Sequence, residues 1–334
     1  MPEPATTVAP AIADADFSAW MTAIAERTER ALDQVLPAPG THPATLHEAM
    51  RYAVLGGGKR VRPLLVHAAG ALVQADPAVL DLAGCAVELV HAYSLVHDDM
   101  PCMDDDALRR GKPTVHVAYG EANAMLVGDA LQALAFEALA RAAGAGAQAP
   151  AVVAMALELA RAAGSVGMAG GQAIDLVSIG RPLDERTLRD MHHRKTGALL
   201  QASVLMGAAC GTTTPAAWQS LSEYGDAIGL AFQVVDDILD VTADSATLGK
   251  TAGKDALADK PTYVSVLGLD RSRRYADDLL QAARAALLRA RLVSFGGTRV
   301  AVPRGDVRAL ARPSPRQLRR RSSETVFRPV GGGV

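Results

Sequence analysis

Two short segments rich in aspartate carry the clearest chemistry in this sequence. The first runs from His97 to Asp106 and the second from Phe232 to Asp240. Each adjoins or lies within an apolar run with helical periodicity, so several carboxylates are concentrated where their mutual repulsion is costly. A bound cation would relieve that repulsion, and hard oxygen ligands favour Mg²⁺ over zinc.

The first segment ends a helix that the sequence predicts over residues 79–98. The macrodipole is negative at that end, so Asp98 and Asp99 are poorly placed there unless a cation is bound. Pro101 should stop the helix, and the chain can then fold back and bring Asp104 near Asp98. Taken alone, this segment is equally compatible with a solvated acidic loop.

The second segment lies inside a predicted helix over residues 215–242. Asp236 and Asp240 are one turn apart and share one face of that helix. Their apolar neighbours indicate a partly buried face, where an unpaired charge is costly. The presence of two such segments in one chain favours a cation site over surface decoration.

Basic residues gather beside the same segments. The six lysines are Lys59, Lys112, Lys195, Lys250, Lys254 and Lys260. Lys59 follows a run of three glycines, a kind of loop that can bring backbone N–H groups close to an anion. Arginine offers bidentate contacts to phosphate and lysine a flexible point charge. Together the acidic and basic clusters indicate a phosphate-type dianion bridged by metal and clamped by cations, although any one cluster could be solvated surface.

The composition predicts an all-α protein. Hydrophobic residues make up 49% of the chain but aromatic residues only 4%, and alanine and leucine suit close-packed helices better than sheets. No segment shows convincing strand alternation. Periodicity predicts helices over residues 17–35, 44–55, 62–75, 79–98, 121–142, 150–170, 185–209, 215–242 and 262–290.

Charge and cysteine content restrict the partners and the compartment. The net charge is −2, but from Arg291 onward there are ten arginines and only two acidic residues, so the preceding chain is acidic. An acidic body argues against nucleic acid as the partner. Three isolated cysteines indicate free thiols in a reducing compartment. The start lacks a signal-peptide pattern and no long uncharged apolar run occurs, so we expect no membrane span and a cytoplasmic location.

Three parts are predicted along the chain. Residues 1–16 are expected to form a disordered arm, residues 17–291 the folded domain, and residues 292–334 a basic, disordered tail. A second hypothesis for the tail is that a shifted reading frame replaced a native last helix, since the composition changes abruptly within a predicted helix. Sequencing the gene around codon 290 in independent isolates would test it.

From about Phe17 to Arg289 the chain resembles the trans-prenyl diphosphate synthase family, most closely its bacterial farnesyl diphosphate synthase type. The resemblance rests on residues 57–63, 98–106, 109–113, 195–196, 232–240 and 249–250. Two extra residues inside the first acidic segment, in the stretch with Pro101 and Cys102, are typical of that type. The resemblance implies the isoprenoid synthase fold, a single bundle of about ten helices around a central cavity, and a homodimer.

The resemblance also implies roles for individual residues. Three Mg²⁺ ions, with Mn²⁺ as the alternative metal, would be held by Asp98, Asp99, Asp104, Asp236, Asp237 and Asp240. Substrate would be bound by Lys59, Arg62, His91, Arg109, Arg110, Lys195, Thr196, Gln233, Lys250 and Lys260. The residues implied as catalytic are Lys195, Thr196, Gln233, Asp98, Asp104 and Asp236.

The implied reaction joins isopentenyl diphosphate to dimethylallyl or geranyl diphosphate and gives farnesyl diphosphate. Tyr93 precedes Asp98 by five residues, or about 7.5 Å of helix. Its ring would block further growth of the product chain and so set the product length. The alternatives are a geranylgeranyl or geranyl diphosphate synthase, and an inactive partner subunit of a heteromeric prenyl synthase. A terpene cyclase is disfavoured, because cyclases lack the segment from Gly57 to Lys59.

Overall fold

The computed structural model describes residues 14–242 and 261–290, which are almost entirely helical. The elements are α1 (Asp14–Val35), α2 (Ala44–Val54), α3 (Val61–Leu72), α4 (Pro77–Asp98), β1 (Leu108–Arg109), β2 (Lys112–Pro113), α5 (Val115–Tyr119), α6 (Glu121–Arg141), the 3₁₀ turn η1 (Ala142–Ala145), α7 (Ala149–Ala163), α8 (Met168–Ser178), α9 (Glu185–His192), the π turn η2 (His193–Gly197), α10 (Ala198–Ala209), α11 (Pro215–Thr242), α14 (Tyr263–Leu267) and α15 (Leu269–Arg289). The predicted all-α class is confirmed.

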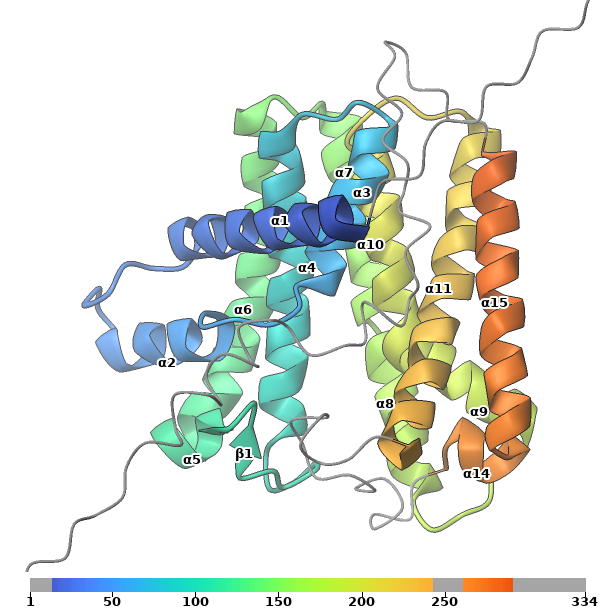
Figure 1. Cartoon of the computed structure of the whole chain (residues 1–334). Coiled ribbons are helices and arrows are strands. Elements are labelled where there is room, and N and C mark those ends of the chain that lie inside the picture. Colours follow the sequence, from blue (N-terminus) through green and yellow to red (C-terminus); the bar gives the residue numbers. More distant parts are fainter. Residues whose placement is uncertain (1–13, 243–260, 291–334) are drawn as a thin grey trace, which may run out of the picture.

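Most of the long helices run alongside one another in a bundle, and α1 lies across one side of it (Figure 1). Helix α4 packs against α3 and α6, while α10 packs against α3, α7 and α11. Helix α15 packs along α11, and α1 contacts both α3 and α4. The bundle therefore brings the end of α4 and the length of α11 into one framework, although they are far apart in the sequence.

Helices α4 and α10 form the centre of the bundle. Nine of the twelve residues of α10 are buried, and in α4 the run from Ala83 to Val90 is buried without a break. A helix that is apolar on every side has to be surrounded by other helices. The functional side chains on α4 are consequently fixed by a rigid core element rather than by a loop.

Small residues allow this close packing. A Cβ atom added at Gly207 of α10 would overlap the carbonyl oxygen of Val66 in α3, and one added at Gly70 would overlap the side chain of Leu80. Glycine at such positions lets two helix backbones approach each other directly. The small side chains that dominate the composition thus serve helix contacts in the interior.

Three predicted helices are divided in the structure. The predicted helix over residues 150–170 is split into α7 and α8, and that over residues 262–290 is split at Gly268, where φ is 78°. The predicted helix over residues 185–209 contains the π turn η2. A short antiparallel hairpin, β1–β2, was not predicted because strands of two residues are too short to show alternation. Helix α1 begins at Asp14, inside the arm predicted to end at residue 16.

Two helical stretches are long and apolar enough to pass a membrane-span criterion by composition. One is α4, and 67% of its apolar window is buried inside the bundle, as in the core helix of a globular protein. The other, Ala149–Ser178, is 33% buried and is interrupted between α7 and α8. All three cysteines lie in the described residues and are free thiols, as predicted.

We predict that Gly207→Ala lowers the free energy of unfolding by about 1–3 kcal/mol, because its methyl group would collide with the backbone of α3. Urea denaturation followed by circular dichroism measures this. Gly144→Ala is the matched control, since a Cβ atom there meets open space. Equal stability of the two variants would show that α3 and α10 are not in such close contact.

Candidate active site

The first acidic segment folds back on the end of α4, as the sequence predicted. The backbone N–H of Asp104 donates to the carbonyl of Asp98 at 2.8 Å, and that of Asp106 donates to the carbonyl of Asp99 at 3.1 Å. Pro101 lies at the exposed tip of the turn. The two ends of the segment are thus held side by side by backbone hydrogen bonds.

Asp98 lies in an electrostatically unfavourable place. Burial raises the pKa of its carboxyl group to about 6, and the neighbouring Asp104 and Asp99 act in the same direction. Lys195 and Arg109 oppose this rise, so both cations lie within electrostatic reach of Asp98 from other parts of the chain. A bound cation would remove the cost of ionising this group.

Asp99, next to Asp98, is paired directly with Arg109. Its buried carboxylate accepts hydrogen bonds from Nε of Arg109 at 2.8 and 2.7 Å and also pairs with Nη2. Arg109 belongs to strand β1, and Asp106 approaches it at 3.8 Å. The resemblance placed Asp99 among the metal-site residues, and in this structure its carboxylate is paired with Arg109.

Asp237 on α11 is likewise occupied by protein partners. Its Oδ1 accepts from the side-chain amide of Gln233 at 2.8 Å, and its Oδ2 accepts from the backbone N–H of Tyr263 at 2.7 Å. The oxygen of Gln233 is therefore turned toward Thr196, whose hydroxyl donates to it at 3.0 Å. Asp237 thus orients the pair of residues that the resemblance placed near the reacting carbons.

The other two aspartates of the second acidic segment are Asp236, which is partly exposed, and Asp240, which is 5% exposed. Within the described residues, the buried Oδ1 of Asp240 has no hydrogen-bond partner. Buried carboxylate oxygens are normally satisfied, so this atom is suited to a ligand. Both residues lie on the helix face predicted from their spacing.

Lys195 and Thr196 lie in the π turn η2, and such turns are frequent at functional sites. Glycines allow the turn to be wedged between helices: a Cβ atom on Gly171 of α8 would overlap the backbone of Lys195, and one on Gly229 of α11 would come within 2.7 Å of Cα of Gly197. The ammonium group of Lys195 pairs with the buried Asp175 of α8 at 2.5 Å. Asp175 was missed from the sequence, although a lone carboxylate in an apolar helical segment was a signal.

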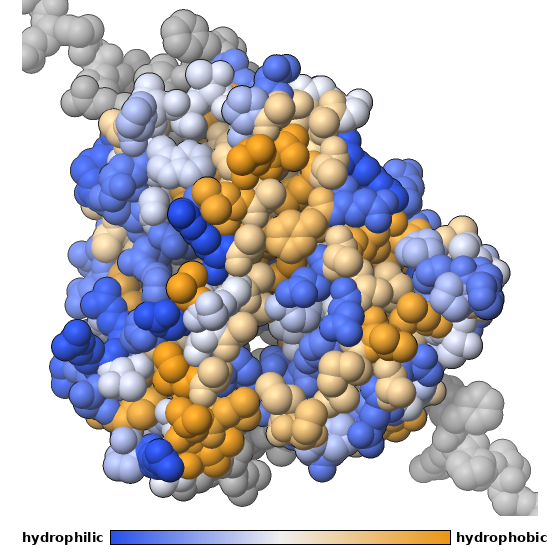
Figure 2. All heavy atoms as spheres, turned by 180° about the vertical axis from the view of Figure 1, so that it is seen from behind, coloured by the Kyte–Doolittle hydropathy of each residue, from blue (hydrophilic) through white to orange (hydrophobic). Residues whose placement is uncertain are grey.

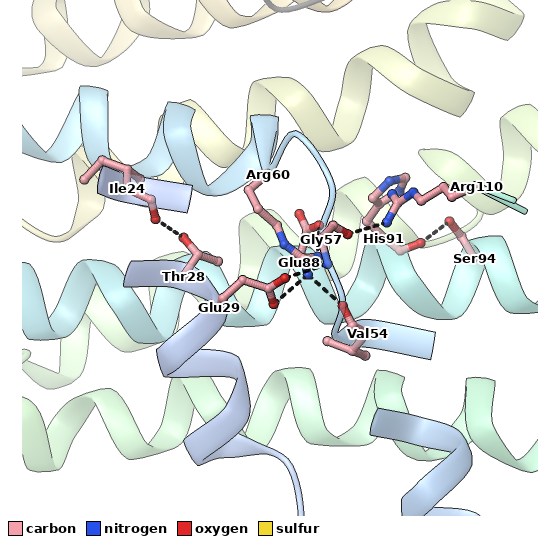
Figure 3. Close-up of polar contacts among 10 residues, drawn as sticks. All are labelled: Ile24, Thr28, Glu29, Val54, Gly57, Arg60, Glu88, His91, Ser94 and Arg110. Carbon is pink, nitrogen blue, oxygen red and sulfur yellow. Dashed lines mark hydrogen bonds and ion pairs between the residues drawn. The ribbon is translucent and has the colours of Figure 1, made fainter. Parts of the chain in front are cut away.

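A second cationic group lies at the glycine loop. The guanidinium of Arg110 donates to the carbonyl of Gly57 at 2.9 Å, and His91 of α4 lies beside Arg110 (Figure 3). Burial lowers the pKa of His91 well below its usual value, and Arg62 and Arg110 lower it further. Burial also lowers the pKa of Arg62 to about 10, with Glu88 opposing and Arg110 adding to the effect. Neighbouring positive charges at the loop disfavour one another's protonated form, and a bound anion would offset this effect.

The remaining predicted residues are placed as follows. Lys59 is partly buried in the loop between Gly58 and Arg60. Tyr93 of α4 is partly buried against the main core, and its ring meets that of His97 edge-on at 5.9 Å. The predicted Lys250 and Lys260 and the tail over residues 292–334 lie outside the described residues.

The acidic residues fit an ion that is shared with phosphate. Within the described residues, no group of three or more histidine, cysteine, aspartate or glutamate side chains forms a metal site by itself. Mg²⁺ usually binds proteins through one or two carboxylates, and water and substrate phosphates complete its coordination. The donor set therefore suits Mg²⁺ bound together with a phosphate ligand and does not suit a closed structural site.

Comparison with known proteins decides the family. Residues 43–287 match the family model described as polyprenyl synthetase. The chain belongs to the polyprenyl synthetase family. The resemblance identified from the sequence is thereby confirmed, and the matched region contains the glycine loop and both acidic segments.

Three relatives illustrate the range of similarity. The chain is 52% identical to a probable farnesyl diphosphate synthase of Bradyrhizobium diazoefficiens, covering 80% of this chain and 81% of the relative. It is 49% identical to geranylgeranyl pyrophosphate synthase 12 of Arabidopsis thaliana, covering 82% and 76%. A geranyltransferase from Helicobacter pylori, solved in complex with magnesium and isoprenyl diphosphate, superposes with a TM-score of 0.71 at 35% identity, covering 84% of this chain and 92% of that one.

In this member of the polyprenyl synthetase family, the acidic site should lower the free energy of unfolding of the metal-free protein. The pKa of Asp98 is higher in the folded state than in the unfolded chain, so its ionisation destabilises the metal-free protein progressively as pH rises from about 4 to 6. We predict that Asp98→Asn raises the free energy of unfolding above pH 6 by up to about 3 kcal/mol, and that the gain shrinks below pH 6.

Thermal unfolding in the presence of a chelator across this pH range measures the effect of Asp98→Asn. Asp105→Asn is the matched control, because Asp105 lies in the same turn but is exposed. A loss of stability in Asp98→Asn at pH 8 would contradict the electrostatic description of the site.

Proposed function

We propose that the protein is a prenyltransferase that condenses isopentenyl diphosphate with dimethylallyl or geranyl diphosphate to give farnesyl diphosphate. One observation carries the proposal: cations gather at two places near the end of α4. Lys195 and Arg109 are paired with the buried Asp175 and Asp99, whereas Arg110 is bonded to Gly57 in the glycine loop. A reaction between two diphosphates needs two such binding places. The identity of 52% to a farnesyl diphosphate synthase supports the same reaction.

On this proposal the allylic diphosphate binds between the acidic walls. Mg²⁺, in three ions and with Mn²⁺ as a substitute, would be held by Asp98 and Asp104 of the first acidic segment and by Asp236 and Asp240 of the second. The magnesium in the Helicobacter pylori relative supports this choice of metal. When bound, the metal stabilises negative charge on the diphosphate leaving group. Asp99 and Asp237 serve the site through Arg109 and Gln233, which they hold.

The protein's own cations assist departure of the diphosphate. Lys195, fixed by Asp175, and Arg109, fixed by Asp99, are held before the reaction begins. Cations that are already oriented toward developing charge stabilise the transition state without a reorganisation cost. Lys250 and Lys260 are proposed to add to this clamp.

Thr196 and Gln233 are proposed to steady the allylic cation. The hydroxyl hydrogen of Thr196 is committed to Gln233, and the amide hydrogens of Gln233 include one committed to Asp237. This direction of hydrogen bonding turns the oxygen lone pairs of Thr196 toward the surroundings, where they can face positive charge. The proton lost after condensation goes to the released diphosphate, so no dedicated protein base is needed.

Isopentenyl diphosphate is proposed to bind at the glycine loop, through Lys59, Arg62, His91 and Arg110. The lowered pKa of His91 keeps its ring neutral at pH 7. A neutral ring donates one hydrogen bond without adding charge to a group that already repels itself.

Product length and assembly are the finer parts of the proposal. Geranylgeranyl or geranyl diphosphate is the alternative product, and an inactive partner subunit is the alternative role.

We propose a cytoplasmic homodimer. Exposed apolar side chains on α6, α7 and α8 support a protein interface, and Figure 2 shows apolar residues gathered along the face opposite to that seen in Figure 1.

We predict that the purified full chain converts isopentenyl and geranyl diphosphates to a fifteen-carbon product, and that a chelator abolishes turnover until Mg²⁺ is restored. Chromatography of the dephosphorylated products measures this. A folded protein that gives no product with either allylic substrate, with Mg²⁺ or Mn²⁺, would favour the inactive-subunit alternative.

We predict that Tyr93→Ala lengthens the product beyond fifteen carbons, because it removes the ring that would block the growing tail along α4. Tyr93→Phe should retain the fifteen-carbon product, since it keeps the ring. Tyr119→Ala, which removes another partly buried tyrosine, is the control. An unchanged product length in Tyr93→Ala would show that another residue limits the growth of the chain.

A further inference from the structure

Glu29 on α1 reaches the glycine loop from outside the part of the chain that matches the family model. That match begins at residue 43, whereas α1 ends at Val35. Figure 3 shows the carboxylate of Glu29 pointing toward Gly57 and Arg60, with Glu88 of α4 on the other side of the arginine. The first helix therefore contributes to the part of the molecule that carries Lys59 and Arg62.

The contacts form a closed ionic network around Arg60. One carboxylate oxygen of Glu29 accepts from the N–H of Gly57 at 2.7 Å, and the other accepts from Nη2 of Arg60 at 3.0 Å. Nη1 of Arg60 donates to Glu88 at 2.7 Å, and its Nη2 donates also to the carbonyl of Val54 at 2.7 Å. Arg60 is only 3% exposed. Its guanidinium thus binds protein groups rather than a ligand.

The network holds a backbone that would otherwise be unfavourable. Arg60 has φ of 48°, in the left-handed region that costs energy for a residue with a side chain. Gly57, with φ of 105°, has both backbone groups engaged, its N–H by Glu29 and its carbonyl by Arg110. Lys59 and Arg62 flank Arg60 in sequence, so fixing Arg60 fixes the directions in which both cations leave the loop.

The two arginines that follow the glycine loop, Arg60 and Arg62, have different electrostatic surroundings. Arg60 is flanked by two carboxylates, and both raise its pKa against the effect of burial. Arg62 has a lowered pKa, and its buried Nε has no hydrogen-bond partner within the described residues. Glu29 and Glu88 thus bind Arg60 directly, whereas Arg62 has no direct carboxylate partner among the contacts of the described residues.

We propose that Glu29 and Glu88 are positioning residues for the isopentenyl diphosphate subsite, and that α1 is thereby part of the active site. The inference rests on the proposed function. It requires that loss of the Glu29 contacts weaken the isopentenyl diphosphate subsite selectively, since the allylic site is held by Asp99 and Asp175 instead.

The test compares Glu29→Gln with Asp33→Asn in the full chain. Gly57 and Arg60 donate to different oxygens of Glu29, and glutamine replaces one of these oxygens with an NH2 group, so one donor loses its partner. Asp33 lies on the same helix, pairs with Arg51 and has a side chain that is 57% exposed, so its variant removes a carboxylate of α1 away from the loop. The measurements are steady-state kinetics with each substrate varied in turn, and calorimetric binding of isopentenyl diphosphate.

We expect Glu29→Gln to raise KM for isopentenyl diphosphate by about tenfold or more, to weaken its calorimetric binding in parallel, and to leave KM for geranyl diphosphate unchanged. Glu88→Gln should show the same selectivity, and Asp33→Asn should behave as the unmodified protein. If Glu29→Gln fails to fold, Glu29→Asp is judged by the same criterion, because it keeps the charge but withdraws it from the loop.

Two outcomes would overturn the inference while the proposed function stands. One is an unchanged KM for isopentenyl diphosphate in a folded variant. The other is a fall in kcat and melting temperature without selectivity between the substrates, which would mean that Glu29 is only structural. An unmodified protein without activity would instead refute the proposed function itself.

Discussion

The site is organised around carboxylates placed where they are poorly tolerated. Asp98 ends helix α4 at its negative pole. Its burial, with a smaller effect of Asp104 and Asp99, raises the pKa of its carboxyl group to about 6. Lys195 and Arg109 are brought to it from a π turn and from a hairpin, and each is held by a buried carboxylate of its own. An enzyme that must bind metal and diphosphate reversibly benefits from such a site, because ligand binding relieves an existing strain.

Close helix contacts make this arrangement possible. Gly171 and Gly229 admit the π turn between α8 and α11, and Gly207 admits α10 against α3. Each contact brings one backbone directly against another, so the site is supported by core elements and not by mobile side chains. The orientation of Thr196 through Gln233 and Asp237 is a consequence of the same packing.

The two proposed substrate subsites are held by different kinds of contact. The allylic side depends on pairs between a cation and one buried carboxylate, Lys195 with Asp175 and Arg109 with Asp99. The loop side depends on Arg60, whose contacts join α1, the end of α2 and α4. On the proposed function, this division lets one helix, α4, serve two anionic ligands that are bound separately and then react.

Sequence by itself determined the helical class, the two acidic segments, the fold-back at Pro101 and the family, because these depend on local periodicity, spacing and residue type. It also indicated most of the cations of the site. It could not show that Asp99 pairs with Arg109 and that Asp237 pairs with Gln233 and Tyr263, since neighbouring carboxylates look alike until their partners are known.

Only the tertiary structure decided which residues support the site. Glu29, Glu88 and Asp175 act through contacts with residues 20 to 31 positions away, and no local pattern encodes such a pairing. The breaks at Gly268 and between α7 and α8 were likewise not predicted, because helical periodicity continues across them. Local chemistry thus specifies the reactive groups, and the burial of whole helices specifies how they are held.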